Sequence, residues 1–478
     1  MYRETRCSAY NAVPMKRQLV RRPVDLTTGP ITRSLIQLAW PVMLSNLFQT
    51  LYNFADRLWL GRWGSVGIAA VQVSFPLVFL TISVASGITV AGMALIAQYT
   101  GANREEDANL AAGQVFVFSA ALAIVLAVAG YFAAGPVISL MGADPELTAA
   151  ATTYLQIIFI GAPLIFSTFL FAALLTGIGD TVTPMILMAV SVAANIILDP
   201  FFIFGWGPFP EWGVRGAAVA TVLSRGLVAL AGFYLLFSGK LGIHIRVSHL
   251  KPRWERIRQI ASIGSMASIG QTGTALGFTI LNGALARLGT AVISAFGIGT
   301  AFISLVLMPA MGLGQATATM VGQNLGASKP ERARRVAWDG VLISTLILVA
   351  AAALVIPFRP YLIRFFMSDP EVLEIGVRML LLVGFAFPFM GIIQVMTGVY
   401  QGSGHTAYSM FFGLFRLWGL RIPLVYLLAY VLSWGSNGVW WAMFWSNMGT
   451  ALVALGFFLT GNWARRVIKT LPGENASV

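Results

Sequence analysis

Charged residues are scarce in this sequence, and their scarcity indicates the class of protein. Only 10% of the 478 residues are Asp, Glu, Lys or Arg, whereas hydrophobic residues make up 57%. A soluble domain averages about 25% charged residues, so little of this surface can face water. The composition therefore predicts a protein that is largely surrounded by lipid.

Other absences argue against enzymatic chemistry. The only cysteine, Cys7, cannot form an internal disulfide, and the histidines at positions 244, 249 and 405 do not form a metal-binding pattern. The sequence has no nucleotide-binding G-x-x-x-x-G-K-[ST] loop and no nucleophile elbow. We therefore expect no enzymatic activity, no cofactor and no structural metal. Uphill transport by such a chain would have to draw on an ion gradient.

Long apolar runs, by contrast, are abundant. Many exceed the ~20 residues that a helix needs to cross the hydrocarbon core, and they lack the alternating polarity of barrel strands. We predict an all-α polytopic membrane protein with twelve transmembrane helices. The predicted spans are residues 34–60, 67–98, 109–134, 148–177, 183–206, 213–239, 258–286, 290–323, 334–357, 372–402, 409–434 and 437–463.

The chain contains two copies of one structural unit. At an offset of 225 residues, identical residues recur without a gap over more than a hundred positions. One offset held over that length indicates an internal repeat. Six spans in each copy make the repeats parallel, so we predict two six-helix lobes related by pseudo-two-fold symmetry. The expected divisions are an N-terminal tail at 1–33, an N-lobe at 34–239, a linker at 240–257, a C-lobe at 258–463 and a C-terminal tail at 464–478.

The net charge of +13 reflects how basic residues are distributed among the loops. If the N-terminus is cytoplasmic, twenty-one Lys and Arg residues lie on the cytoplasmic side of the predicted spans and five lie opposite. That asymmetry places both termini in the cytoplasm. The charge is typical of membrane topology and contact with anionic lipids, and we expect no nucleic-acid binding.

Two acids inside predicted spans do not repeat. Asp56 falls on Leu281 and Asp199 falls on Leu424 at the offset of 225. An Asp at the centre of a transmembrane helix costs roughly 2.5–3.5 kcal/mol on insertion scales, so each acid is a candidate functional residue.

The neighbours of these acids strengthen the interpretation. Tyr52 precedes Asp56 by four residues and Asn195 precedes Asp199 by four, so each pair shares one helix face. Spans 1 and 5 run in the same direction, which brings both acids toward the same side of the membrane. Two carboxyl groups that converge in one cavity could share a proton or coordinate a small cation.

Structural explanations exist for the same residues. Asp56 could be an interfacial acid that pairs with Arg57 or Arg62, and Asp199 could accompany a helix break at Pro200. Arg421, in span 11, could reach toward the interface or line the cavity. Pro41 removes a backbone hydrogen bond within span 1, which allows either a static bend or a moving hinge.

The region from about 30 to 465 resembles the multidrug and toxic compound extrusion (MATE) transporters. The segments that carry the resemblance are LAWPVMLSNLFQTLYNFADRLWLGRWG, AQYTGA and GQNLGA, TGIGDTVTP, NIILDP and GVRGAAVAT. The resemblance implies two lobes around a central cleft and drug efflux in exchange for protons or sodium.

The branch named for the DNA-damage-inducible protein F is the most similar, and it carries its coupling acids in the N-terminal lobe. The matching residues would be Pro41 for the bend, Tyr52, Asp56, Asn195 and Asp199 for substrate binding, and Asp56, Asn195, Asp199 and Thr221 for ion coupling.

The sequence departs from the NorM branch of the same family. That branch is associated with acids in helices 7 and 10, and spans 7 and 10 here contain no acid in mid-membrane. We therefore expect a monomeric efflux antiporter in the inner membrane of a prokaryote, which exports cationic or amphipathic molecules in exchange for H⁺ or Na⁺. The alternative is a flippase for a lipid-linked oligosaccharide or lipid, which would need basic residues in its cavity, and Arg421 is the feature that favours it.

Overall fold

A computed structural model describes residues 26–142, 144–367 and 369–468, and this part of the chain contains helices and no strand. The N-lobe helices are α1 (Ile31–Trp63), α2 (Ser65–Gly101), α3 (Glu105–Leu140), α4 (Pro145–Ile160), α5 (Ala162–Gly177), α6 (Val182–Phe204) and α7 (Val214–Ser238). After a short 3₁₀ turn, η1 (Val247–Leu250), come α8 (Trp254–Ala286), α9 (Thr290–Gly326), α10 (Pro330–Phe366) and α11 (Pro370–Gly402). The chain ends with α12 (Thr406–Leu414), η2 (Phe415–Arg421), α13 (Ile422–Val425), η3 (Tyr426–Val431), α14 (Ser436–Leu459) and η4 (Asn462–Ala464).

These helices confirm the predicted all-α class. Across the described residues, nine helices are long and apolar enough to span a membrane, and the α4–α5 pair, bent by 52°, supplies a tenth span. The run from α12 through η3 forms one span of 26 residues. The two other long helices, α1 and α8, occupy equivalent places in the two repeats and are more polar, which is consistent with a position at the lobe interface.

The bend between α4 and α5 has a local cause. Gly161 separates the two helices, and Pro163, which has no backbone N–H, lies in the first turn of α5. Pro388, its counterpart at the offset of 225, lies inside α11, which continues without a break. The same proline therefore interrupts the span in one lobe and is accommodated in the other.

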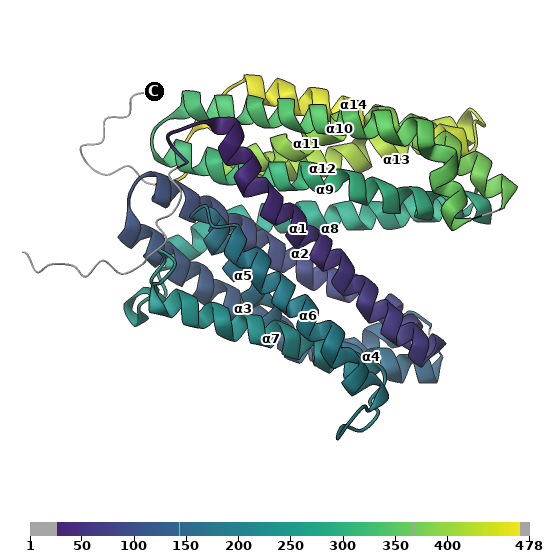
Figure 1. Ribbon diagram of the computed structural model, residues 1–478, viewed down its shortest axis with the longest axis horizontal. Helices are drawn as coiled ribbons and strands as arrows, with labels where there is room; N and C mark the ends of the chain where they lie inside the picture. Colours follow the sequence, from purple (N-terminus) through teal and green to yellow (C-terminus); the bar gives the residue numbers. More distant parts are fainter. Residues whose placement is uncertain (1–25, 143, 368, 469–478) are drawn as a thin grey trace, which may run out of the picture.

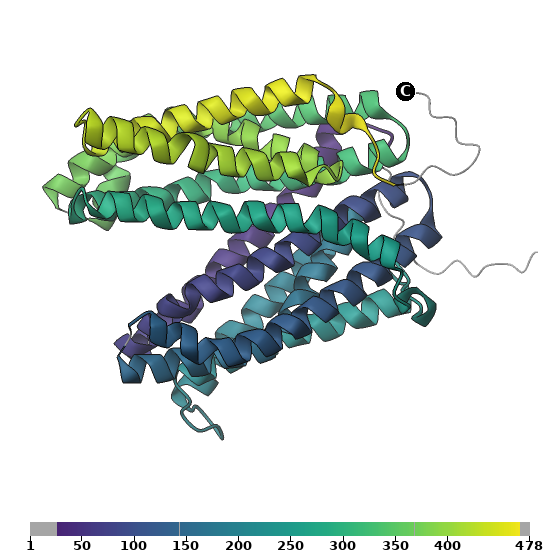
Figure 2. The same cartoon turned by 180° about the vertical axis from the view of Figure 1, so that it is seen from behind.

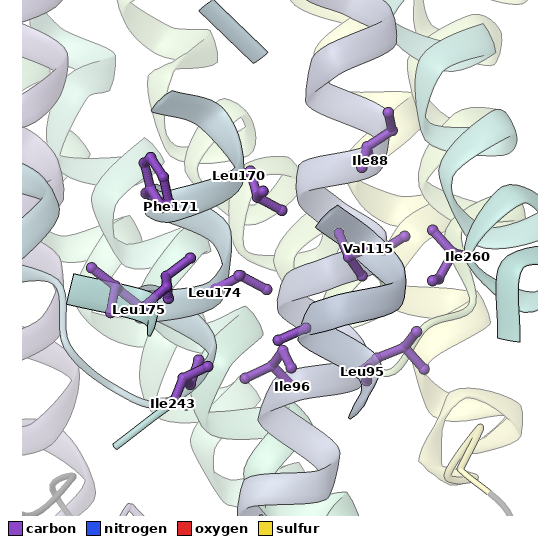
Figure 3. Close-up of a cluster of buried hydrophobic side chains, with 14 of the residues drawn as sticks. Ile88, Leu95, Ile96, Val115, Leu170, Phe171, Leu174, Leu175, Ile243 and Ile260 are labelled. Carbon is purple, nitrogen blue, oxygen red and sulfur yellow. The ribbon is translucent and has the colours of Figure 1, made fainter. Parts of the chain in front are cut away.

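The two lobes form two groups of helices in Figures 1 and 2, which meet at one end and separate toward the other. Each lobe has its own apolar core. Figure 3 shows part of the N-lobe core, where Ile96 of α2, Val115 of α3 and Leu174 of α5 pack together. Ile260 of α8 joins this cluster, so the core of the N-lobe extends onto a C-lobe helix.

The end at which the lobes meet, here called the converging end, is built on close approaches of small residues. A Cβ on Gly101 would lie 1.9 Å from the Gln323 carbonyl oxygen, and a Cβ on Gly326 would lie 1.9 Å from the Gln98 carbonyl oxygen. Only glycine allows the backbones of α2 and α9 to come this close. Gly101 and Gly326 are repeat equivalents, as are Gln98 and Gln323.

Side-chain hydrogen bonds across the converging end follow the same symmetry. Gln98 of α2 donates through Nε2 to the carbonyl oxygens of Gly402 at 3.3 Å and Ser403 at 3.1 Å. Gln323 of α9 donates through Nε2 to the carbonyl oxygen of Gly177 at 2.9 Å. Gly177 and Gly402 are themselves repeat equivalents. The two lobes are therefore joined by two hydrogen-bonded contacts that mirror each other.

Short segments beside the helices strengthen this end. Within the predicted N-terminal tail, the described residues 26–30 contact the C-lobe, because Asn324 and Arg332 donate to backbone carbonyl oxygens of Leu26 and Thr28. At the other terminus, the Val467 amide donates to Gln98 Oε1 at 2.9 Å. Residues 1–25 and 469–478, which include Cys7 and most of the predicted tails, lie outside the described residues.

The inter-lobe linker is fastened to α3. Gln114 is fully buried and donates to the carbonyl oxygens of His249 and Lys251, at 2.7 and 2.8 Å. The Arg253 amide donates in turn to Gln114 Oε1 at 2.7 Å. The linker is therefore fixed in place up to the start of α8, at Trp254.

Candidate functional site

The two unduplicated acids meet between α1 and α6. Asn195 donates through Nδ2 to Asp199 Oδ1 at 3.1 Å, one helical turn apart on α6. The Asp56 carboxyl group, on α1, lies close enough to the Asp199 carboxyl and the Asn195 amide to interact with both electrostatically. The structure therefore brings the two acids and Asn195 together at the contact between α1 and α6.

Burial leaves this pair incompletely satisfied. Asn195 and Asp199 have no solvent-exposed surface, and Asp56 is partly buried. Asp56 Oδ1, Asp199 Oδ2 and Asn195 Oδ1 are buried atoms that receive no hydrogen bond from the residues that the structure describes. Buried polar atoms nearly always have a partner, and adjacent carboxylates repel each other when both are ionised. One proton or one small cation between the carboxyl groups would give the buried oxygens a partner and would remove the repulsion between the carboxylates.

A polar cluster from α7 borders the acids through Tyr52. The Tyr52 hydroxyl lies 3.3 Å from Ser224 Oγ, and Ser224 Oγ is 2.9 Å from the Thr221 backbone carbonyl oxygen, to which it donates. The guanidinium of Arg225 stands over the Tyr52 ring, 4.7 Å from its centroid. Thr221 is thus linked to Tyr52 through Ser224, and the structure gives it no hydrogen bond to either acid within the described residues.

Two residues near the acids were missed from the sequence. Arg225 donates to Gln49 Oε1 at 2.8 Å and is close enough to Asp56 to interact with it electrostatically. Tyr154, a buried residue of α4, also lies within electrostatic range of both acids. Arg225 follows Thr221 by four residues, and this spacing could have placed it on the same helix face. No comparable pattern marked Tyr154.

An N-lobe cavity of about 360 Å³ opens beside this cluster. Its wall comes from α1, α2, α5, α6 and α7, with Gln315 of α9 contributed by the other lobe. Pockets for small organic ligands run to about 300–1,000 Å³, so the volume suits one such molecule. Arg225 lines the cavity, whereas Tyr52, Asp56, Asn195 and Asp199 do not. Arg225 therefore connects the predicted coupling residues to the space in which a substrate would fit.

The remaining predicted residues lie elsewhere. Pro41 is buried inside α1, and the adjacent Ala39 carbonyl faces Gly312 of α9, so this part of α1 packs on the C-lobe. Arg421 is buried in the C-lobe and donates through Nε to Ser446 Oγ at 3.0 Å. In the described ranges, no group of three or more His, Cys, Asp or Glu side chains could hold a metal ion.

Two pseudo-symmetric groups of membrane-spanning helices, with a buried acid pair and a ligand-sized cavity, define an integral membrane transporter. The MatE family model matches the chain twice, over residues 41–201 and 267–427. The chain therefore belongs to the MATE family, whose members are transporters and not enzymes, and the two matches follow the internal repeat.

Similar proteins agree with this assignment. The chain is 30% identical over 443 residues to a probable multidrug resistance protein NorM of Thermotoga maritima, covering 92% of this chain and 95% of the relative. It is 28% identical over 419 residues to an FAD transporter of Shewanella oneidensis, covering 85% and 90%. A solved outward-facing conformation of a multidrug resistance MATE family transporter has a TM-score of 0.86 and 25% identity, covering 94% and 100%. The likeness to a NorM-named protein does not test the predicted branch, which stays a prediction.

Proposed function

We propose that this chain is a multidrug efflux antiporter that couples export to the entry of H⁺ or Na⁺ through Asp56 and Asp199. The observation that supports the proposal is the buried contact between these two carboxyl groups, with one oxygen of each lacking a donor from the described residues. A carrier without a nucleotide site needs a group whose charge changes during the cycle. A carboxyl pair can gain or lose one proton as a unit.

Coupling to substrate would pass through the polar cluster on α7. Binding of one cation to the acid pair changes its charge by one unit, close to Arg225 and Tyr52. Arg225 lines the N-lobe cavity. Ionised acids would offset the positive charge of Arg225 and allow a positively charged or amphipathic substrate to bind beside it, whereas neutralised acids would leave Arg225 uncompensated and favour release. Thr221 would contribute by holding Ser224 beside the Tyr52 hydroxyl, a smaller role than the direct ion coupling expected from the sequence.

The lobes would provide alternating access. With the termini in the cytoplasm of a prokaryotic inner membrane, the converging end would face the cytoplasm and the lobes would separate toward the outside, as expected of an outward-facing state. Rocking of one lobe against the other is the usual motion in transporters built from parallel repeats. Pro41 lies where α1 crosses onto the C-lobe, which is a suitable position for a bend that follows this motion.

Transport in proteoliposomes tests the proposal. We would measure efflux of a fluorescent organic cation, ethidium, under an imposed pH gradient or an imposed Na⁺ gradient. Asp56→Asn and Asp199→Asn should each abolish gradient-driven efflux, because the pair can no longer exchange the coupling ion. Glu374→Gln, which removes an exposed acid of an α11 ion pair, is the matched control and should transport normally.

The gradient that drives efflux would identify the coupling ion. Full gradient-driven efflux in both Asp variants would refute the assignment of the acids. Movement that needs no gradient and survives both substitutions would instead favour the flippase alternative.

A further inference from the structure

The C-lobe contains a second cavity of about 130 Å³, formed by α8, α11, α12 and η2. Much of its wall is polar. The side chains that matter here are Gln271, Thr274, Gln394, Thr397, Gln401 and Arg416. A volume below the usual 300 Å³ for a whole ligand indicates room for one polar group.

This cavity is the repeat counterpart of the N-lobe cavity. With one exception, Met410, each of its lining residues lies 225 positions after a residue that lines the N-lobe cavity. The chemistry has changed at the matched positions. Gln394 stands where the N-lobe has Phe169, and Arg416 stands where it has Ser191. The C-lobe has therefore kept the position of the cavity and gained a cation and a hydrogen-bonding amide in its wall.

Arg416 has no counter-charge. No acid lines the cavity, and Arg416 forms no ion pair or hydrogen bond with any residue that the structure describes. Its Nε atom is buried without an acceptor. Arg421, which has the same sign and donates to Ser446 Oγ, lies within electrostatic range of Arg416. A partly buried cation without a partner is costly, so it indicates a place for an anion.

The backbone around Arg416 is also unusual. Segment η2, with Arg416 near its start and Arg421 at its end, is a π-helix, whereas the equivalent N-lobe helix α6 is regular α-helix throughout. π-Helical turns are rare and occur frequently at functional sites. The change of helix type thus coincides with the two arginines that the N-lobe lacks.

We propose that the C-lobe cavity is a binding site for an oxyanion, the carboxylate or phosphate group of an amphipathic molecule. Arg416 binds the anion through a charge-assisted hydrogen bond, and the amides of Gln271 and Gln394 donate from opposite walls of α8 and α11. This site is separate from the acid pair and does not depend on the antiport mechanism.

Binding to the full chain in phosphatidylcholine nanodiscs tests this site without any transport measurement. The probe is hexyl phosphate, followed by isothermal titration calorimetry, with hexanol and hexylammonium as the neutral and cationic counterparts. The wild type should bind hexyl phosphate, with the other two at least 10-fold weaker. Arg416→Gln should weaken hexyl phosphate binding by on the order of 10-fold to 100-fold, the range for losing a hydrogen bond to a charged group.

Two further variants keep the result interpretable. Arg364→Gln removes an exposed arginine of α10 and should bind as the wild type does. Gln394→Leu tests the amide in the opposite wall, and it should weaken hexyl phosphate binding several-fold even if Arg416→Gln does not fold. Equal binding of hexyl phosphate and hexylammonium, or unchanged affinity in a folded Arg416→Gln variant, would overturn the proposal.

A lipid arm distinguishes the source of the anion. Phosphatidic acid in the nanodisc should reduce the apparent affinity for hexyl phosphate if a lipid headgroup enters the cavity. Undiminished affinity would assign the site to anions from solution. Each result supports the oxyanion site and identifies how the ligand reaches it.

Discussion

Substitution of Gln98 by leucine should favour opening of the converging end. Gln98 contributes two hydrogen bonds across the lobe interface, to Gly402 and Ser403, whereas its repeat equivalent Gln323 contributes one, to Gly177. A neutral intramolecular hydrogen bond contributes about 0.5–1.5 kcal/mol net. Gln98→Leu should therefore favour the open form by about 1–3 kcal/mol and Gln323→Leu by about 0.5–1.5 kcal/mol. These energies correspond to population changes of roughly 5-fold to 150-fold and roughly 2-fold to 12-fold.

The chain is well suited to a distance measurement, because Cys7 is its only cysteine. In a Cys7→Ser background, spin labels at Glu105→Cys and Glu331→Cys would report the separation of the lobes, since both positions are exposed at the converging end. Double electron–electron resonance gives the populations of short and long distances. Gln98→Leu and Gln323→Leu should each increase the long-distance population, and the increase should be larger for Gln98→Leu.

Gln114→Leu is the matched control. Gln114 is also fully buried and also makes three hydrogen bonds to backbone groups, but it holds the linker to α3 and not one lobe to the other. Its replacement should lower thermal stability without changing the distance distribution. The reasoning is wrong if Gln98→Leu leaves the distances unchanged, or if Gln323→Leu has the larger effect.

Two more predictions concern the same end. Gly101→Ala places a Cβ 1.9 Å from the Gln323 carbonyl oxygen, so it should force α2 and α9 apart and enlarge the long-distance population, whereas Gly456→Ala in α14, with open space around its Cβ position, should not. Burial lowers the pKa of His405, an effect to which Arg465 adds and which a hydrogen bond with Ser403 opposes. The closed form therefore favours the neutral imidazole, and the converging end should open as pH falls below about 6.5. His405→Gln should remove this pH dependence in the same assay, and a dependence that persists would assign it to another group.

The sequence predicted the spans well because lipid imposes a strong and local constraint. Every predicted span coincides with a helix or with helices that follow one another directly, and most helix ends differ from the predicted ends by a few residues. The ends were less predictable, since α3 and α10 continue past the apolar run and α8 begins at Trp254, within the predicted linker. The extensions of α3 and α10 run through Pro136, Pro357 and Pro360, and a proline inside a helical pattern usually indicates a helix end.

The acid pair was predictable for a different reason. Asp56 and Asp199 stood out because each is costly in a membrane and each lacks a repeat counterpart, and helix periodicity assigned a neighbour to each. Arg225 was harder to find because its four-residue spacing from Thr221 indicates only a shared helix face. Its importance depends on tertiary contacts with Gln49 and Tyr52, which belong to another helix.

Arg416 shows the limit of single-residue reasoning. The sequence analysis selected Arg421 as the candidate cavity cation, but Arg421 is bonded to Ser446 and Arg416 lines the C-lobe cavity. The two arginines are five residues apart, and in a regular α-helix they would point in different directions. The π-helical turn between them changes the directions in which the two side chains point. Hydropathy does not predict a π-helical turn.

The equivalent contacts of Gln98 and Gln323 at the converging end also affect how such a protein can evolve by mutation. In an ancestor that assembled from two identical chains, one substitution at this glutamine would have altered both contacts at once. Joining the copies in one chain removed that restriction, and Gln98 now has a partner, the Val467 amide, that Gln323 does not share. Two contacts that began as equivalents can thus come to differ in their contribution to the closed converging end. Mutation can then change one contact while the other keeps the lobes aligned.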